Sequence, residues 1–569
     1  MFLDDSRHTG MIRTRFTLAL LFSAAILSGC GAGGGGTSFS SSQRPAVAAA
    51  APDNEVANAV ANEPMAAIDA FRLLEQATFG PTLDDINSVA SIGPGTWIDQ
   101  QMQMPATFMS DGLARANSEQ WNEYINVWWR HAIQAEDQLR QRVAFALSQI
   151  FVVSSDGAGL GQQQFGLANY YDILLRHSYG NYRDLLQEIT LNPAMGTYLS
   201  MKGNQKPDPE QNIQPDENYA REVLQLFSIG QVMLNDDGTA ILDEDGVPLP
   251  AYDQSTIENF ARVFTGWHYA NADHFIWPQN KDYISRMEPW EQYHDTDSKT
   301  LLNGQEVPAG LSASEDLKTA LDNIFNHPNV GPFISRQLIQ RLVTSNPSNE
   351  YVRDVARVFN SNHAGERGSL ASTIKAILMH REARRGHIDQ PTTFGKLKEP
   401  LIRMTQLWRA FEPASIPFGF NYGWVENEFS QAPLSSPSVF NFYRPDYSPP
   451  GEIQDMDLVS PEFQITDETS IIRVTNRLLA STLWSHNFKN DNNANRIAID
   501  ISHEMQLEPD RDAFLDHLDL LLLGGHMTPE LRQTVSQMMD TRNYANAASQ
   551  RVVEAIYLIV SSPEAALQF

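Results

Sequence analysis

The chain has 569 residues, of which 42% are hydrophobic, and its formal net charge at pH 7 is −28. Such an acidic composition without a Lys/Arg run argues against a nucleic-acid-binding protein, because binding to phosphates requires basic side chains. A single cysteine, Cys30, excludes an internal disulfide and a metal site built from several cysteines. The length is sufficient for a large core and predicts more than one domain.

The N-terminal segment is typical of an export signal. Arg13 and Arg15 precede an apolar stretch at residues 16–26, which is too short to span a bilayer. The stretch ends in LSGC at residues 27–30, which resembles the bacterial lipobox, where the cysteine is acylated and becomes the mature N-terminus. The alternative is an ordinary cleaved signal peptide with a chance cysteine. We predict a signal peptide at residues 1–29, with Met11 as the true start, and lipidation (palmitate) of Cys30.

The resemblance to lipoprotein precursors implies a location as well as a modification. Gly31 follows the cysteine, whereas an aspartate there would resemble a retention signal for the inner membrane. We therefore expect an outer membrane lipoprotein with its body in the periplasm or at the cell surface. Residues 30–64, the lipidated cysteine and a Gly-, Ser- and Ala-rich segment, are predicted to be a disordered tether.

From residue 65 onward the sequence predicts a mainly α-helical body that extends to residue 569, with a possible subdivision near residue 390. Apolar residues recur with helical spacing, and capping residues precede many of the segments. The expected helices cover residues 66–77, 83–91, 119–131, 135–153, 166–177, 181–192, 216–229, 254–264, 314–326, 329–343, 351–361, 370–379, 395–411, 467–483, 510–522, 529–540 and 547–560. The aromatic residues of segment 119–131 are expected to pack in the core.

Strand signals are few, and the clearest lie at residues 231–252. Two Asp-Gly-containing runs, at residues 235–238 and 243–246, separate short apolar segments. This pattern predicts one or two short β-hairpin insertions. Calcium loops are the alternative, but the twelve-residue ligand spacing with a terminal Glu is missing, which favours turns.

The first candidate site residues lie on the expected helix that begins at Asp216. Glu217 and Arg221 are four residues apart on one stripe, and Asn218 and Glu222 are four apart on an adjacent stripe. Glu can act as an acid or a base, and Arg can hold an anion. The structural alternative, an ordinary Glu–Arg helix pair, is favoured by the spacing.

The second set of candidates lies in a long polar and aromatic segment, residues 265–299. It contains Trp267, His268, His294, Asp295 and Lys299. Long irregular segments on a helical scaffold often carry sites. His268, His274, His294 and Asp295 could bind zinc or iron, but their spacing is irregular, so no metal and no other cofactor is predicted. Tryptophans beside acidic residues would also suit a sugar.

Several short sequence motifs of the chain together resemble those of one bacterial family, known as domain of unknown function 1800. They are LLEQATFGPT at 73–82, DENYAREVLQLF at 216–227, ARVFTGW at 261–267, HD at 294–295 with Lys299, and PSVFNFYRPDY at 437–447. The resemblance extends over nearly all of the body. It implies an exported protein, and it implies an exported sulfatase-like protein as a possible partner, but it implies no reaction.

Two functional hypotheses follow. The first is an exported, membrane-anchored lipoprotein that acts as a helical scaffold or accessory protein for an envelope partner or an extracellular polymer. The second is an envelope enzyme, a hydrolase or a metal-dependent oxidoreductase. Its catalytic residues would be Glu217, Arg221, Glu222, His294 and Asp295, with Asn218, Trp267, His268 and Lys299 in binding roles. Convergence of these residues in one pocket would favour the enzyme.

Overall fold

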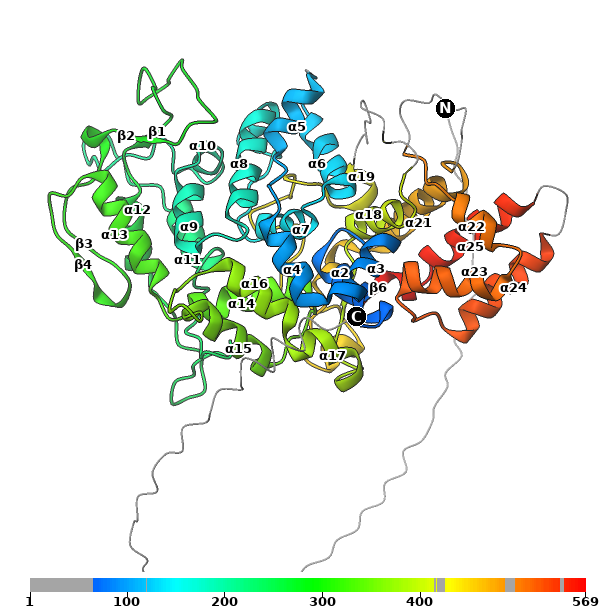
Figure 1. Cartoon of the computed structure of the whole chain (residues 1–569). Coiled ribbons are helices and arrows are strands. Elements are labelled where there is room, and N and C mark those ends of the chain that lie inside the picture. The colour runs from blue at the N-terminus through cyan, green and yellow to red at the C-terminus, as the bar shows by residue number, and fades with distance from the viewer. Residues whose placement is uncertain (1–64, 119, 414–415, 417–424, 487–496, 543–546) are drawn as a thin grey trace, which may run out of the picture. The chain divides into compact units, whose positions relative to one another are not determined.

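The computed structural model describes residues 65–118, 120–413, 416, 425–486, 497–542 and 547–569 (Figure 1). All of these residues belong to one compact unit, which contains residues 54–569. The predicted signal peptide, Cys30 and the predicted tether lie outside the described residues. Within the described part of the chain, no helix is long and apolar enough to cross a membrane.

The body is mainly α-helical, as the periodicity predicts. The α-helices are α2 (Ala67–Ala77), α3 (Leu83–Ile92), α4 (Pro94–Gln103), α5 (Met109–Ala116), α6 (Glu123–Gln134), α7 (Gln138–Ser148), α8 (Gln164–His177), α9 (Tyr182–Thr190), α10 (Pro193–Tyr198), α11 (Asn218–Gln225), α12 (Gln254–Val263), α13 (Ala313–Phe325), α14 (Val330–Leu342), α15 (Asn349–Asn360), α16 (Leu370–Met379), α17 (Arg381–Asp389), α18 (Pro400–Ala410), α19 (Val425–Phe429), α20 (Glu452–Asp455), α21 (Glu468–Leu483), α22 (Ser502–Leu507), α23 (Arg511–Leu518), α24 (Pro529–Thr541) and α25 (Ala548–Val560).

Local sequence signals explain where many helices begin. Thr82 and Asp85 form a capping box at the start of α3, and Ser312 and Glu315 form another at the start of α13. In each box the two side chains satisfy backbone amides that have no partner inside the helix. Asp253 caps α12 with a single bond, by accepting from the Thr256 amide.

Strands are short and pair locally. The pairs are β1 (Trp267–His268) with β2 (Glu288–Pro289), β3 (Lys299–Thr300) with β4 (Glu306–Val307), and β5 (Lys396–Leu397) with β6 (Leu567–Gln568), all antiparallel. The hairpins predicted at residues 231–252 are present as antiparallel bridges, which pair Val232 with Pro250, Leu234 with Ala240, and Leu242 with Pro248. The carboxylate of Asp243 accepts from the amides of Asp245 and Val247, so it stabilises its own turn.

The core gathers the aromatic residues of α6. Tyr124, Trp128 and Trp129 are at most 1% exposed, whereas Trp121 is 42% exposed. Phe79 and Trp129 both pack edge-on against Trp128. The expected core packing is therefore confirmed for three of the four aromatic residues, and Trp121 lies outside because α6 begins only at Glu123.

Several helix boundaries differ from the expectation. The helix expected over residues 395–411 spans only α18, because residues 396–397 form the strand β5, and the helix expected over 216–229 is shortened to α11. The bounds also differ around α6 and α7. The structure ends α6 at Gln134 and begins α7 at Gln138, whereas the sequence predicts helices over residues 119–131 and 135–153. Ala135 is extended, and the Gln138 side chain donates to the Ala135 carbonyl at 2.8 Å. The buried Asp137 carboxylate accepts from the Thr107 amide. The local bond from Gln138 and the tertiary contact with Thr107 fix the turn between the two helices.

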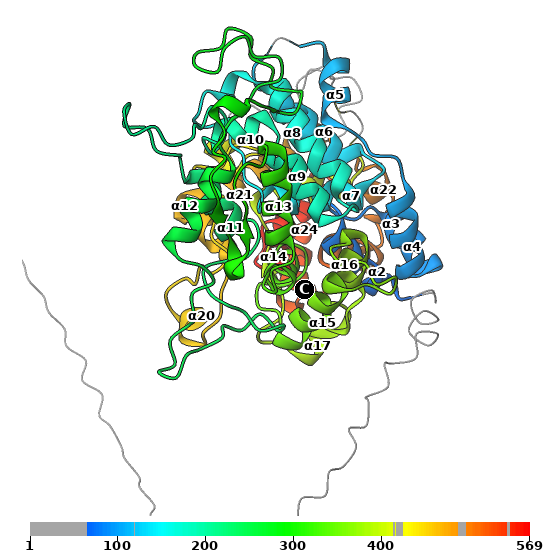
Figure 2. The same cartoon turned by 90° about the vertical axis from the view of Figure 1, so that its left-hand side faces the viewer.

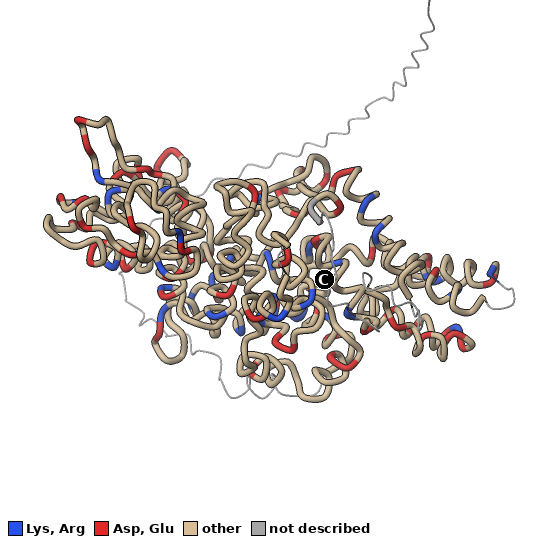
Figure 3. Tube along the Cα trace, turned by 90° about the horizontal axis from the view of Figure 1, so that it is seen from above, with Lys and Arg blue, Asp and Glu red and all other residues tan. Residues whose placement is uncertain are grey.

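The arrangement of α9 and α13 determines where the candidate site lies. Both views show α9, in teal, and α13, in green, side by side (Figures 1 and 2), and the two helices are in contact. β1 and α12 lie nearby in the same region (Figure 1). Basic and acidic residues are interspersed along the whole described trace (Figure 3).

Candidate functional site

The helix with the first candidates, α11, places its charged residues in different surroundings. Glu217 and Arg221 form an ion pair at 2.7 Å, and both side chains are at least one third exposed. The Gln254 amide donates to the same Glu217 oxygen at 2.9 Å. Asn218 is exposed in the first turn of the helix. This group has the geometry of a surface helix pair joined to the start of α12.

Glu222, on the same helix, faces inward. It is 6% exposed, and within the described part of the chain its buried Oε2 has no hydrogen-bond partner. Burial raises the pKa of Glu222, and Arg221 opposes this shift. Burial raises the pKa of Tyr252 to about 12, and the negative charge of Glu222 adds to this shift. Glu222 does not line the cavity described below.

His294, Asp295 and Lys299 meet in one buried cluster. His294 Nε2 lies 3.2 Å from Asp316 Oδ2, and Lys299 Nζ donates to the same oxygen at 2.7 Å. Lys299 also donates to the carbonyls of Asp295 and Asp297, at 2.6 and 2.8 Å. Below we call His294, Asp295, Lys299, Asp316 and Arg262 the lysine cluster.

Arg262, at the end of α12, completes the lysine cluster. Its guanidinium donates two hydrogen bonds to the Asp295 carboxylate, at 2.8 and 3.1 Å. Burial would raise the pKa of Asp295, but the bonds from Arg262 and from the Asp297 amide outweigh it and hold that pKa below its usual value. The hydrogen bonding between Arg262 and the Asp295 carboxylate in turn raises the pKa of Arg262. This cluster fastens segment 265–299 to α12 and α13.

The imidazole, ammonium and carboxylate groups of the lysine cluster are buried, whereas its Arg262 is half-buried. His294, Lys299 and Asp295 are 0%, 2% and 4% exposed. No hydrogen bond or ion pair of the described residues joins this cluster to the Glu217–Arg221 pair. The predicted catalytic residues are thus distributed over three places: the lysine cluster, the surface pair and the buried Glu222.

His268 and Trp267, the residues of β1, lie at a junction of aromatic rings and helices. The buried His268 accepts from the Tyr269 amide through Nδ1 at 2.8 Å. Burial, assisted by the charge of Lys202, lowers the pKa of His268 to about 4, so its ring is neutral at pH 7. Trp267 is 3% exposed, and among the described residues its indole nitrogen has no acceptor. A buried N–H without an acceptor is costly, so the indole of Trp267 is a candidate donor.

A cavity of about 470 Å³ adjoins Trp267 between α9 and α13. This volume lies in the range of roughly 300–1,000 Å³ typical of small-molecule sites. We call it the Trp267 cavity. Its lining consists of Arg183, Asp184, Gln187, Leu191, Trp267, Ser314, Leu317, Lys318 and Asp322.

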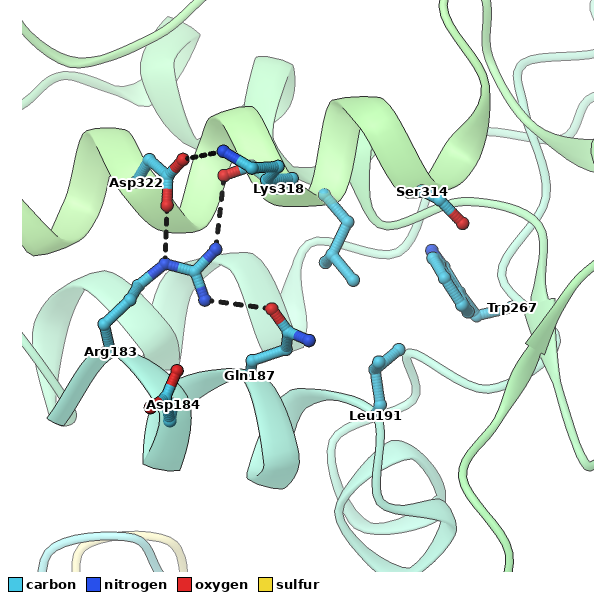
Figure 4. Close-up of a pocket in the computed structure, with 9 residues that line it drawn as sticks. Arg183, Asp184, Gln187, Leu191, Trp267, Ser314, Lys318 and Asp322 are labelled. Carbon is cyan, nitrogen blue, oxygen red and sulfur yellow. Dashed lines mark hydrogen bonds and ion pairs between the residues drawn. The ribbon is translucent and has the colours of Figure 1, made fainter. Parts of the chain in front are cut away.

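Figure 4 shows how the polar groups of the Trp267 cavity are held. Arg183 donates to Asp322 at 2.7 Å, to the Gln187 side-chain oxygen at 3.1 Å and to the Lys318 carbonyl. Lys318 pairs with the other oxygen of Asp322 at 2.6 Å. Trp267 and Ser314 lie on the opposite side from Arg183. The charges on the wall are thus largely paired, whereas the Trp267 N–H is a donor without an acceptor in the described chain.

A second buried cluster was not predicted from the sequence. Lys396 pairs with Glu462 at 2.9 Å, and both side chains are at most 2% exposed. Nearby, Gln149 donates to the Glu399 carboxylate at 2.6 Å and accepts from the hydroxyl of Tyr443. Tyr443 belongs to the sequence motif at residues 437–447, and burial raises its pKa well above the usual value. That motif is the one sequence signal for this cluster, but it does not indicate Gln149 or Glu399 as partners.

Metal ligation finds no support in the described geometry. Among the residues that the structure describes, no group of three or more His, Cys, Asp or Glu side chains is arranged to hold a metal ion. His274, one of the four residues considered as ligands, is exposed and contacts the neighbouring Asp273. His294 and Asp295 are engaged in the lysine cluster.

The fold and the site define a mainly helical protein with a polar cavity and two closed clusters of buried charge. Residues 72–567 match the family described as "Protein of unknown function (DUF1800)", and the chain therefore belongs to this family. No curated protein matches the chain, and no solved structure matches it.

Proposed function

We propose that this protein is an exported, lipid-anchored binding protein whose helical body holds a saccharide unit of an extracellular polymer in the Trp267 cavity. The observation that carries the proposal is the buried indole N–H of Trp267, which lacks an acceptor in the described chain and borders a cavity of ligand size. A ligand oxygen would satisfy this donor, and satisfying a buried donor is worth about 1–3 kcal/mol.

The chemistry of the wall favours a neutral ligand rich in hydroxyl groups. Arg183 and Lys318 share the Asp322 carboxylate, and Asp184 also lines the cavity, so the two positive and two negative charges of the wall balance. Ser314 can both donate and accept, and the carboxylate of the exposed Asp184 can accept. Sugar hydroxyls likewise donate and accept, which suits such a mixed wall.

The competing hypothesis, an envelope hydrolase or metal-dependent oxidoreductase, requires a group that touches substrate. His294, Asp295 and Lys299 are closed off from solvent, and Glu217 is paired with Arg221. General acid–base catalysis needs the acting group within hydrogen-bond reach of the substrate. The burial of the lysine cluster therefore supports a binding role for this region over a catalytic one.

Replacing Trp267 by phenylalanine is expected to weaken saccharide binding about fivefold. The change keeps an aromatic ring but removes the N–H that would donate to the ligand, and one such bond is worth about 1 kcal/mol. Isothermal titration of the full chain with a panel of neutral oligosaccharides measures the effect.

The matched control for this change is Trp277→Phe, because Trp277 is 85% exposed and does not line the cavity. The Trp277→Phe variant should bind the oligosaccharides with the affinity of the wild type. If none of the oligosaccharides binds, or if Trp267→Phe binds as tightly as the wild type, the saccharide proposal is wrong.

The anchor in this proposal depends on Cys30, which lies outside the described residues. Buried acyl chains contribute about 0.8 kcal/mol per methylene, so several chains give stable attachment. In the producing cell, Cys30→Ser should abolish labelling by radioactive palmitate and move the protein from the envelope fraction to the soluble fraction. Ser38→Ala, in the predicted tether, should change neither; continued pelleting of unlabelled Cys30→Ser protein would contradict the anchor.

The outer-membrane location and the exported sulfatase-like partner implied by the family resemblance stay predictions. A pull-down with the anchored protein from its host would test the partner directly.

A further inference from the structure

The segment between β1 and β2, residues 269–287, extends away from the helices of the body (Figures 1 and 2). It carries two adjacent apolar side chains that face solvent: Ile276 is 52% exposed and Trp277 is 85% exposed. Ile284, on the same segment, is 52% exposed as well. Exposed apolar side chains that occur together mark a contact surface. We call residues 273–284 the tryptophan loop and residues 274–281 its tip.

A buried ring and a carboxylate hold the tryptophan loop in shape. Phe275 is 4% exposed, and its ring stacks on that of Tyr293 with centroids 4.0 Å apart. The Asp273 carboxylate accepts from the amides of residues 279 and 280, at 2.8 and 3.1 Å, and so closes the turn. The chain is therefore fixed within two residues of Trp277, and the exposed indole stands on a structured base.

The backbone at Trp277 adopts a conformation that a bulky residue rarely takes. Its φ is +58°, in the left-handed region that favours glycine. This conformation costs free energy, and strain of this kind gathers at sites of ligand contact. The tryptophan loop thus presents a large aromatic side chain to solvent despite a backbone penalty, which points to a contact that the indole makes outside the chain.

The composition of the tip suits the interfacial region of a lipid bilayer. Tryptophan is enriched at membrane–water interfaces, because its ring is apolar whereas its N–H is polar. The chain as a whole carries a net charge of −28 and would be repelled by anionic headgroups. Residues 274–281, in contrast, contain one lysine and no carboxylate. The flanking carboxylates of Asp273 and Asp282 are engaged with backbone amides of the loop.

The length of chain between Cys30 and the body allows the tryptophan loop to reach the membrane. Residues 31–64, which are 34 residues, separate this cysteine from the first described residue, Met65. A segment of this length spans at most roughly 110–120 Å when extended, and about 30 Å on average as a flexible coil. A body held at that distance meets the bilayer at high effective concentration, so that weak insertion is sufficient.

We propose that the tryptophan loop docks on the lipid bilayer to which Cys30 anchors the chain, with the side chains of Ile276 and Trp277 in the interfacial region. This inference rests on the lipid anchor of the proposed function and not on its saccharide. Transfer of the two side chains from water to the interface is favourable because it buries apolar area. The loop then provides a second point of attachment and determines which face of the body turns toward the membrane.

The test places the purified lipidated chain in phosphatidylethanolamine–phosphatidylglycerol vesicles, with or without bromine on the acyl chains, which quenches an indole close to it. The wild type should lose about one tenth of its tryptophan emission in brominated vesicles, because one of its ten tryptophans would insert. Trp277→Phe should abolish this loss by removing the reporter. Ile276→Asp should abolish it by placing a carboxylate at the tip. Ile388→Asp, which changes a 57% exposed isoleucine on α17, is the matched control and should keep the loss.

Equal emission of the wild type in the two kinds of vesicle would overturn the proposal. A loss that persists in Trp277→Phe would also overturn it, because another tryptophan would then contact the lipid. Protection of Trp277 from an aqueous quencher without vesicles, increasing with protein concentration, would assign the loop to a second copy of the chain instead. Melting temperatures check the fold of Ile276→Asp, and the comparison of the wild type with Trp277→Phe does not depend on that variant.

Flotation of the protein with the vesicles scores the anchor separately. A chain that neither floats nor takes up palmitate contradicts the anchor of the proposed function. The tryptophan loop is then tested on the same chain, coupled through the Cys30 thiol to a maleimide lipid in the same vesicles. The saccharide titrations contain no vesicles, so Trp277→Phe keeps its place as their control.

Discussion

Replacing Lys299 by methionine is expected to lower the free energy of unfolding by about 3–5 kcal/mol, the usual cost of removing one partner from a buried ion pair. Lys299 is 2% exposed and donates to the Asp316 carboxylate and to two backbone carbonyls. Methionine fills similar space but donates nothing. The carboxylate of Asp316 would keep His294 as its contact but lose its ammonium partner.

Chemical denaturation of the purified chain measures this loss, and Lys375→Met provides the control. Lys375 pairs with Asp99 at 2.5 Å, but both side chains are at least 39% exposed. Such a surface pair is worth about 0–1 kcal/mol. Equal destabilisation of the two variants would contradict the claim that the lysine cluster stabilises the attachment of segment 265–299 to α12 and α13.

Replacing Lys396 by methionine is expected to have a similar effect in the second cluster. Lys396 pairs with Glu462 and donates to the carbonyls of Gln340 and Arg341, at 3.0 and 3.1 Å. Its removal leaves Glu462 as a buried charge, so we expect a loss of about 3–5 kcal/mol at pH 7. Denaturation curves recorded at several pH values test both the size and the pH dependence of this loss.

The sign of the pH dependence follows from Glu462. Burial raises the pKa of Glu462, and Lys396 opposes this shift, so Lys396→Met should raise the pKa of that carboxyl further. A carboxyl whose pKa is higher in the folded than in the unfolded state stabilises the fold least at high pH. The destabilisation by Lys396→Met should therefore shrink as the pH falls and Glu462 becomes protonated. A loss that grows toward acid pH, or one no larger than that of Lys375→Met, would contradict this account.

Helices were predictable where periodicity and capping residues agree. Residues 370–379 form α16 with the predicted bounds because Ser369 caps its start. The next helix, α17, was missed because no Gly or Pro separates it from α16; His380 alone ends one helix and caps the other. The eight-residue α5 was also missed, since so short a segment shows little periodicity.

The candidate site was predictable only in part. Asp295 and Lys299 are four residues apart, and the sequence placed them in one polar segment with His294. Their partners Arg262 and Asp316 lie on two helices that flank this segment, and only tertiary packing brings them together. The Trp267 cavity depends on the pairing of Arg183 with Asp322, which are 139 residues apart. No local pattern specifies such a contact.

A crystal structure of the chain with its tightest-binding oligosaccharide would test the central claim most directly. The account predicts the sugar between α9 and α13, with one of its oxygens within hydrogen-bond distance of Trp267 Nε1. A sugar bound elsewhere on the protein, with the indole N–H still lacking an acceptor, would contradict it.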